Sequence, residues 1–440
     1  MRRLTLWLLL ALLTVVVAGG AFAAGAREAE TDSITVIMPR IAVSRGYPEL
    51  VPEYEAKTGV KVDLIVMPEA EYEQQVMLEL GRRGSGYDVV WAGLAAAQKY
   101  AAEGWIEPLD GYINDPQFTD PVEFDFDDFL QGPVGMFTFD DTIYGLPAMN
   151  ATVLMYYRKD VFAEHGIESP PETWAELMEV AETIHSADMA AIAMRGSRSR
   201  YGVMWPFPMI AHSFGAKFVV DYPRDMRPVV DSPEMIQAAE YYAKLLRDYG
   251  FSGATTGHWS EVVVAYQQGH AAIAIDGAPL VGTLLDPEES VAAGKTGFAP
   301  VPRGPAAHWP PANGHALTIP VGSRNKAVAW DFIKWALSKE TQLENGLRNT
   351  ETALTRVSVI NDPSYQEKFD YGDGEYLEAL NKTFDVLKPY YWPIVPEWRE
   401  AEDYISVALS EILTGIKDAE TALGEAQRAM YEVFQEAGYY

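Results

Sequence analysis

The chain has 440 residues, of which 63 are acidic and 34 are basic, so its formal net charge is −29, and it contains no cysteine. A negative field of this size repels phosphate backbones and anionic lipid head groups, which argues against binding to nucleic acid or to a membrane surface. The lack of cysteine removes disulfides, thiolate metal sites and a cysteine nucleophile. We expect a soluble monomer.

The first residues have the three-part layout of a secretory signal peptide. Two arginines precede an apolar run over residues 4–18, and the small residues 21–24 follow it. That run is shorter than the roughly 20 residues that cross a bilayer. We therefore predict a signal peptide over residues 1–23. Because no cysteine is available for lipid modification, the mature protein is expected to be free in the periplasm without a lipid anchor.

The next part of the chain alternates short β-rich runs with amphipathic segments. This β-α-β-α-β order predicts a mainly parallel sheet with helices on both faces, a doubly wound arrangement. Gly59 and Gly81 follow the two helical patterns and suit the left-handed position at a helix end. The expected strands are 34–38, 60–66 and 87–91, and the expected helices are 48–57 and 69–81.

A second set of elements follows Pro147, and the chain is longer than one hydrophobic core usually supports. We find no repeat and no flexible linker, so two lobes joined by short crossovers are expected, an arrangement that suits a hinge. The expected strands are 153–157, 191–194 and 271–275, and the expected helices are 171–186, 232–250 and 422–434.

Catalytic and metal-binding signatures are scarce. The Gly-Lys-Thr at 294–296 resembles the end of a P-loop, but Glu289 stands where the first glycine should be. His308 and His315 have no carboxylate or third histidine in register, so we interpret both as loop histidines with ordinary partners. Carboxylates are numerous enough for a glycosidase pair, although nothing selects one. We expect no catalytic residue, no metal and no cofactor.

Several ordered passages carry a resemblance to a known family. The segments YGLPAMNATVLMYYRKD (144–160), PETWAEL (171–177), YQQGHAAIAIDG (266–277), IPVGSRNK with the helix after it (319–338), and 393–415 resemble the family 1 extracellular solute-binding proteins of bacterial ABC importers. Residues 193–196, 290–300 and 355–358 look most like the subgroup that binds sorbitol, mannitol and related sugars.

This resemblance implies a two-lobe periplasmic-binding-protein fold with a cleft and a hinge. Crossovers are expected near Pro147, Ala278 and Ser338. One lobe would hold residues 31–147 plus 278–338, and the other 148–277 plus 339–440. The protein would capture a neutral sugar or sugar alcohol in the cleft and present it to the membrane permease subunits of an ABC importer.

Strand ends near the crossovers are where we expect polar ligand contacts. Asp276 follows the apolar strand 271–275, so its carboxylate should point into the cleft and accept hydroxyl hydrogen bonds, unless it caps the next turn. Arg195 ends the strand 191–194, and its planar fork would bind adjacent hydroxyls or orient Asp276. A plain surface arginine is the alternative, and only the resemblance favours a function, because the polyol-binding subgroup has Arg-Gly at this position.

Aromatic side chains on loops are candidates for stacking on the C–H faces of a sugar. We select Trp309, and Trp392 with its neighbour Tyr391, although a loop tryptophan equally well locks its loop to the core. Weaker candidates are Trp91, which closes the strand 87–91, Asn150, just past the first crossover, and Arg356, which follows from the resemblance alone.

The sequence departs from the resembled pattern at three places. The polyol-binding subgroup has an acidic residue where Ala151 stands and a Tyr-Glu pair where Ala95 and Ala96 stand, and sugar binders of the family often have a tryptophan after the Gly-Pro that matches Ala278-Pro279. The ligand is therefore left open. The alternatives are an exported glycoside hydrolase, or a binding protein for an amino sugar, an oligosaccharide or a cationic metabolite.

Overall fold

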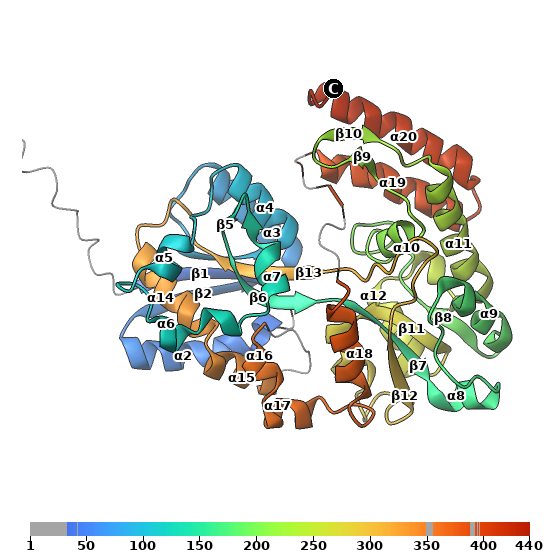
Figure 1. Ribbon diagram of the computed structural model, residues 1–440, viewed down its shortest axis with the longest axis horizontal. Helices are drawn as coiled ribbons and strands as arrows, with labels where there is room; N and C mark the ends of the chain where they lie inside the picture. Colours follow the sequence, from blue (N-terminus) through green and yellow to red (C-terminus); the bar gives the residue numbers. More distant parts are fainter. Residues whose placement is uncertain (1–32, 42, 349–354, 388–391, 394, 396) are drawn as a thin grey trace, which may run out of the picture.

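A computed structural model describes residues 33–440 apart from 42, 349–354, 388–391, 394 and 396, so the predicted signal peptide and Tyr391 lie outside the described residues. Two lobes are evident, each built on its own sheet (Figure 1). Within the described ranges, no helix is long and apolar enough to span a membrane.

The first lobe is built on a five-stranded sheet in the order β2-β1-β3-β13-β6. Strand β1 is parallel to β2 and β3, whereas β13 is antiparallel to both β3 and β6. The predicted β-α-β-α-β order is confirmed for the first five elements. The strands are β1 (Ser33–Pro39), β2 (Lys61–Met67), β3 (Val89–Gly93), β6 (Leu146–Ala151) and β13 (Asn313–Thr318).

Helices cover both faces of this sheet, because alternate residues of each strand point to opposite faces. Helices α2 (Tyr47–Thr58) and α14 (Lys326–Ala336) share one core with Val36 and Leu317. Helices α3 (Glu69–Gly81) and α4 (Leu94–Ala102) share the other core with Ile37 and Ala316. The arrangement is doubly wound, as predicted.

The second lobe is built on a four-stranded sheet in the order β12-β7-β11-β8. Strand β11 is parallel to β8, and β7 is antiparallel to both of its neighbours, so three strands run in one direction and β7 alone runs against them. The reason is that β7 continues from β6 across the single residue Thr152 and enters the sheet from the side of the first lobe (Figure 1). The strands are β7 (Val153–Arg158), β8 (Ala190–Ala193), β11 (Ala271–Gly277) and β12 (Thr296–Pro300).

One large core joins this sheet to the helices around it. These are α9 (Trp174–Ile184), α11 (Pro233–Tyr249), α12 (Trp259–Gln267), α18 (Glu375–Phe384), α19 (Trp398–Leu413) and α20 (Ala419–Glu436). Shorter elements are α5 (Asp110–Asn114), α6 (Pro121–Phe124), α7 (Gln131–Met136), α8 (Lys159–Glu164), α10 (Phe207–Ser213), α13 (Val281–Leu284), α16 (Val357–Ile360), α17 (Pro363–Lys368), and the ribbons β4 (Thr138–Phe139) with β5 (Thr142–Ile143) and β9 (Val219–Asp221) with β10 (Asp225–Pro228).

Two crossovers differ from the expected positions. Strand β12 pairs with β7, so the chain stays with the second sheet past Ala278 and returns to the first sheet between β12 and β13. Helix α15 (Lys339–Arg348) contacts α2 and the short helix η1 (Val43–Gly46), so the chain is still on the first lobe beyond Ser338. The apolar pattern of β12 is compatible with either sheet, so only its hydrogen-bonded partner, β7, shows that it belongs to the second sheet.

The predicted helix ends are partly right. Gly59 ends α2 with φ of +78°, a left-handed conformation that glycine adopts without steric cost. Gly81 is instead the last residue of α3, and the left-handed residue is Arg83, at φ of +53°. Helix α9 begins at Trp174, three residues after Pro171, because the Thr173 hydroxyl accepts a hydrogen bond from the Glu176 N–H.

Candidate ligand-binding site

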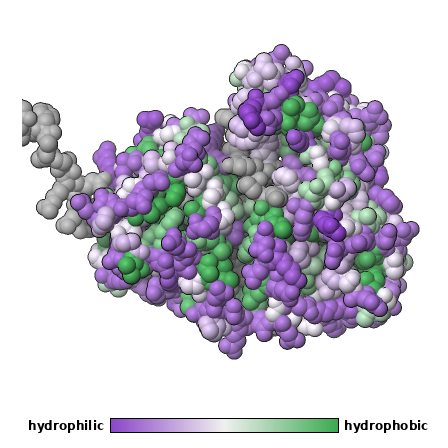
Figure 2. Space-filling model, in the orientation of Figure 1, coloured by the Kyte–Doolittle hydropathy of each residue, from purple (hydrophilic) through white to green (hydrophobic). Residues whose placement is uncertain are grey.

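A cavity of about 490 Å³ lies between the two lobes. The first lobe contributes residues from α3, β3, α4, β6 and β13. The second contributes residues from the segment 195–205, the start of α12, the turn after β11 and the approach to α19. The outer surface of the molecule in the same orientation is mainly hydrophilic, as the charge predicts (Figure 2). Because residues of both lobes line the cavity, the two lobes face a shared site.

Arg195 and Asp276 form a buried ion pair at the cavity. Strands β8 and β11 are parallel, and Ala193 is paired with Ala274. Arg195 and Asp276, each two residues further along its strand direction, therefore lie side by side at the same edge of the sheet. The Arg195 Nε donates to Asp276 Oδ2 at 2.9 Å and its Nη2 donates to Oδ1 at 2.5 Å. Such a bidentate pair fixes the plane of the guanidinium group.

Asp276 does not point into the cavity, contrary to expectation. Its side chain is fully buried, and Oδ1 also accepts the Gly277 N–H at 2.6 Å. Arg195 lines the cavity, and Asp276 lies on the side of Arg195 away from the cavity. The Asp276 carboxylate therefore orients the Arg195 guanidinium, whereas one role that we expected for the arginine was to orient the carboxylate. Three of the five guanidinium N–H groups are used, because Nη1 donates to the Tyr201 carbonyl at 2.9 Å. The other two have no partner among the described residues.

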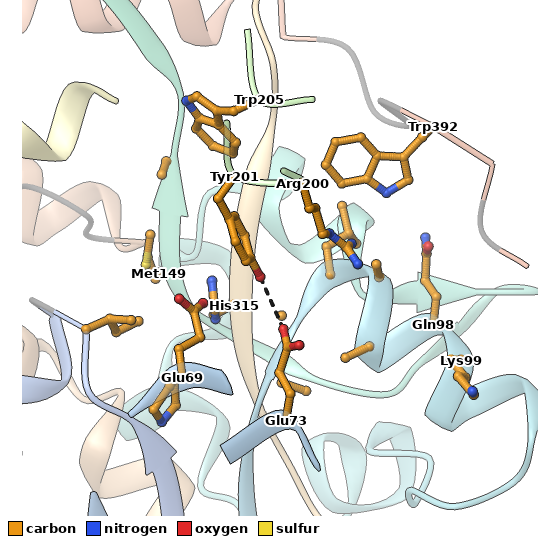
Figure 3. Close-up of a pocket in the computed structure, with 18 of the residues that line it drawn as sticks. Glu69, Glu73, Gln98, Lys99, Met149, Arg200, Tyr201, Trp205, His315 and Trp392 are labelled. Carbon is orange, nitrogen blue, oxygen red and sulfur yellow. Dashed lines mark hydrogen bonds between the residues drawn. The ribbon is translucent and has the colours of Figure 1, made fainter. Parts of the chain in front are cut away.

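Two arginines of the second-lobe wall each lie against an aromatic ring. The Arg195 guanidinium lies 5.2 Å from the centroid of the Trp205 ring, and that of Arg200 lies 5.3 Å from the Trp392 ring. Trp392, predicted as a stacking residue, lines the cavity together with Tyr201 (Figure 3). The second-lobe wall thus combines planar donors with apolar ring faces, the mixture that hydroxylated carbon chains and rings require.

Polar contacts join the two lobes at the cavity. The Tyr201 hydroxyl donates to Glu73 Oε1 on α3 at 3.1 Å (Figure 3). Arg399 Nη1 lies 3.4 Å from Glu73 Oε2. Burial and the charge of Glu73 raise the pKa of Glu69, one turn away, against the opposing effect of Arg200. Glu73 therefore links first-lobe helix α3 to two parts of the second lobe.

His315 is a site residue that the sequence argument missed. It lies on β13 opposite Gly93 and lines the cavity, where burial lowers its pKa to about 4, so that the ring is neutral near pH 7. His308, by contrast, has the ordinary partner that we expected, since its Nε2 lies 2.8 Å from the Val301 carbonyl oxygen. In the part of the chain that the structure covers, no cluster of histidines and carboxylates could hold a metal ion.

The other predicted residues are not all at the cavity. Trp91 lines it, whereas Asn150 is buried on β6 and does not, although its neighbours Met149 and Ala151 do. Trp309 also lies outside the lining and packs on His212, with ring centroids 4.7 Å apart, which fits the loop-locking interpretation.

Arg356 is a structural residue and not a cavity residue. Its side chain is buried between Phe124 and Phe129, and Nε and Nη2 donate to the carbonyls of Leu337 and Phe124 at 2.6 and 2.9 Å. Nη1 lies 3.3 Å from Asp128 Oδ2. The resemblance suggested Arg356 as a ligand contact, but the structure places it outside the cavity lining.

Comparison with known proteins identifies the family of this chain. The family model described as "Bacterial extracellular solute-binding protein" matches residues 41–343. A mannitol-binding protein of Pseudomonas aeruginosa is 26% identical over 401 residues, which are 88% of this chain and 89% of that protein. An erythritol/L-threitol-binding protein of Mycolicibacterium smegmatis is 24% identical over 412 residues, 88% of this chain and 83% of that protein.

Solved structures show the same fold. A solute-binding protein of Agrobacterium radiobacter K84 in complex with ribitol has a TM-score of 0.80 at 23% identity, covering 91% of this chain and 98% of that chain. One from Agrobacterium vitis S4 with bound D-mannitol has a TM-score of 0.77 at 24% identity, covering 92% and 99%. The predicted two-lobe fold and a role in solute binding, not catalysis, are confirmed. The chain belongs to the bacterial extracellular solute-binding protein family.

Proposed function

We propose that this chain captures a neutral sugar or sugar alcohol between its lobes and delivers it to the permease of an ABC importer, as a monomer free in the periplasm. The observation that carries the proposal is the Arg195 fork, which buried Asp276 holds at the cavity with two N–H groups to spare. A fixed planar donor pair beside aromatic rings fits adjacent hydroxyls and the C–H face behind them.

The charges at the cavity support an uncharged ligand. Asp276 compensates Arg195, and Arg200 lies 3.7 Å from Glu402. Glu73 is engaged by Tyr201 and Arg399. Because these ionic groups have partners within the protein, a charged ligand would have to compete with those partners, although Glu69 and Lys99 also line the cavity. The mannitol-binding and erythritol/L-threitol-binding relatives point to polyols.

A glycoside hydrolase site is not supported. Hydrolysis needs two carboxyl groups on opposite sides of a glycosidic bond. Glu69 and Glu73 lie one turn apart on the same helix, and Glu73 already accepts a hydrogen bond from Tyr201. This arrangement suits a contact between lobes better than acid and base catalysis.

Thermal unfolding of the mature protein against sugar alcohols, monosaccharides, disaccharides, amino sugars and cationic metabolites tests the proposal. A ligand that binds only the folded state raises the midpoint, with about 2.7 kcal/mol of added stability at a concentration of 100 Kd. We expect a rise with a neutral polyol or monosaccharide. Arg195→Lys, which keeps the charge but loses the fork, should abolish it, while the exposed Arg224→Lys should not. A rise confined to cations would refute the neutral ligand.

The contacts of Glu73 predict a second result, on closure. Glu73→Gln removes the charge attraction to Arg399, so the ligand-free protein should spend more time open, with a larger radius of gyration in small-angle X-ray scattering and an affinity lower by about 2- to 5-fold. The exposed Glu71→Gln on the same helix is the matched control. An unchanged radius of gyration would show that this contact does not hold the lobes together.

A further inference from the structure

Three buried polar atoms belong to residues of the first-lobe wall of the cavity. They are Trp91 Nε1, Gln98 Oε1 and His315 Nδ1, and none has a hydrogen-bond partner within the described residues. Trp91 and Gln98 are themselves 0% and 7% exposed. Buried polar atoms of folded proteins are nearly always hydrogen-bonded. Three such atoms on one wall of a cavity therefore indicate groups that a bound molecule satisfies.

The fold brings Trp91 and His315 together, and Gln98 lies further along the same wall, beside Lys99. Trp91 on β3 and His315 on the adjacent β13 have ring centroids 6.2 Å apart. The register pairs His315 with Gly93, where an added Cβ would lie 3.5 Å from the imidazole Cε1, so the glycine leaves this side of the ring uncovered. Gln98 is in the second turn of α4, which begins directly after Gly93. His315 and Gln98 both belong to the cavity lining drawn in Figure 3.

We infer that His315, with Gln98 and Trp91, reads uncharged hydroxyl groups on the first-lobe wall, and that His315 is a specificity-determining residue. The inference rests on the proposed function and deepens it. It adds a second point of recognition, on the lobe that does not carry Arg195.

The hydrogen-bonding capacities of the three atoms select for hydroxyl groups. The indole Nε1–H only donates, the amide Oε1 only accepts, and a neutral imidazole does one at each nitrogen. A hydroxyl donates and accepts, so it suits all three atoms. An ammonium group only donates and cannot satisfy Trp91, and a carboxylate only accepts and cannot satisfy Gln98. Burial, which lowers the pKa of His315 to about 4, keeps the ring without charge near pH 7.

The test is isothermal titration calorimetry with D-mannitol, ribitol, gluconate and 1-amino-1-deoxy-D-glucitol. The wild-type protein should bind a neutral polyol at least about 10-fold more tightly than the anionic or cationic analogue. His315→Leu should weaken polyol binding by about 10- to 100-fold, since it leaves a hydroxyl unpaired. His315→Asn, whose amide occupies the place of Nδ1, should recover most of the loss. The exposed His165→Leu is the control and should change nothing.

Gln98→Leu and Gln98→Glu provide an independent pair should His315→Leu fail to fold. Leucine removes the acceptor, while glutamate adds a charge where we infer an uncharged acceptor, so both should weaken polyol binding. If the wild type binds a polyol and the His315→Leu and Gln98→Leu proteins bind it equally well, the inference is overturned and the proposed function stands. If the wild type prefers a charged analogue, or binds no polyol, both fail.

Discussion

Replacing Asp276 with alanine is expected to lower the free energy of unfolding by about 3–5 kcal/mol and to weaken ligand binding by about 100-fold. The substitution leaves the Arg195 guanidinium partly buried without its counter-charge, and it removes both hydrogen bonds that fix the plane of the fork. Urea unfolding measures the first effect and calorimetry the second. Asp276 affects binding although it does not line the cavity.

The double variant Asp276→Ala with Arg195→Met separates the two effects. Removing both charges should recover much of the stability, because no buried charge is left unpaired, while the donors to the ligand remain lost. Binding should therefore stay weak in a protein of near-normal stability. Full binding by the double variant would show that this ion pair supports the fold alone.

Replacing Arg356 with alanine is expected to cost a similar 3–5 kcal/mol of stability and to leave ligand affinity nearly unchanged at a temperature where the variant is folded. The substitution leaves the carbonyls of Leu337 and Phe124 without their donor and Asp128 without the nearer of its two cations, and it empties the space against the Phe129 ring, whose centroid is 3.9 Å from the guanidinium. Urea unfolding and calorimetry on the same preparation check both parts.

Arg356→Lys is the matched variant for this prediction. Lysine keeps the charge near Asp128 but cannot donate from one plane to several carbonyls, so we expect an intermediate loss of stability. A variant of normal stability that no longer binds ligand would return Arg356 to the ligand site and contradict the structure.

The fold was largely predictable because its signals are local. Alternating strand and helix patterns and a glycine such as Gly59 need only neighbouring residues to be interpreted. The position of the second crossover was not predictable, since the apolar run of β12 is compatible with either sheet and its pairing with β7 joins residues far apart in the chain. The direction of β7 was not predictable from its own pattern either, because it depends on how β7 continues from β6.

The site was only partly predictable, for the same reason. Asp276 is predictable because it follows an apolar strand and Arg195 because the resembled subgroup has Arg-Gly at that strand end, but their mutual bonding depends on the register of two strands separated by about 80 residues. Trp205 lies in a segment without periodicity, so no pattern marks it. His315 has no metal-binding partners in the sequence pattern, whereas the structure places it at the cavity, where we infer a role that needs none. Arg356 rested on resemblance alone, which carries no information about burial.

The continuity of β6 and β7 has a consequence for how such a protein can change its ligand. Ala151 is held in the first sheet opposite Asn313 and Val153 in the second opposite Gly277, so only Thr152 separates two fixed registers (Figure 1). The Thr152 carbonyl also accepts the Ala278 N–H at 2.8 Å. A pivot at Thr152 would be main chain, while most of the walls that meet a ligand are side chains on other elements, with Met149 and Ala151 of β6 as the exceptions on this strand. Substitutions in the walls can alter which solute is recognised without altering the path along which the lobes come together.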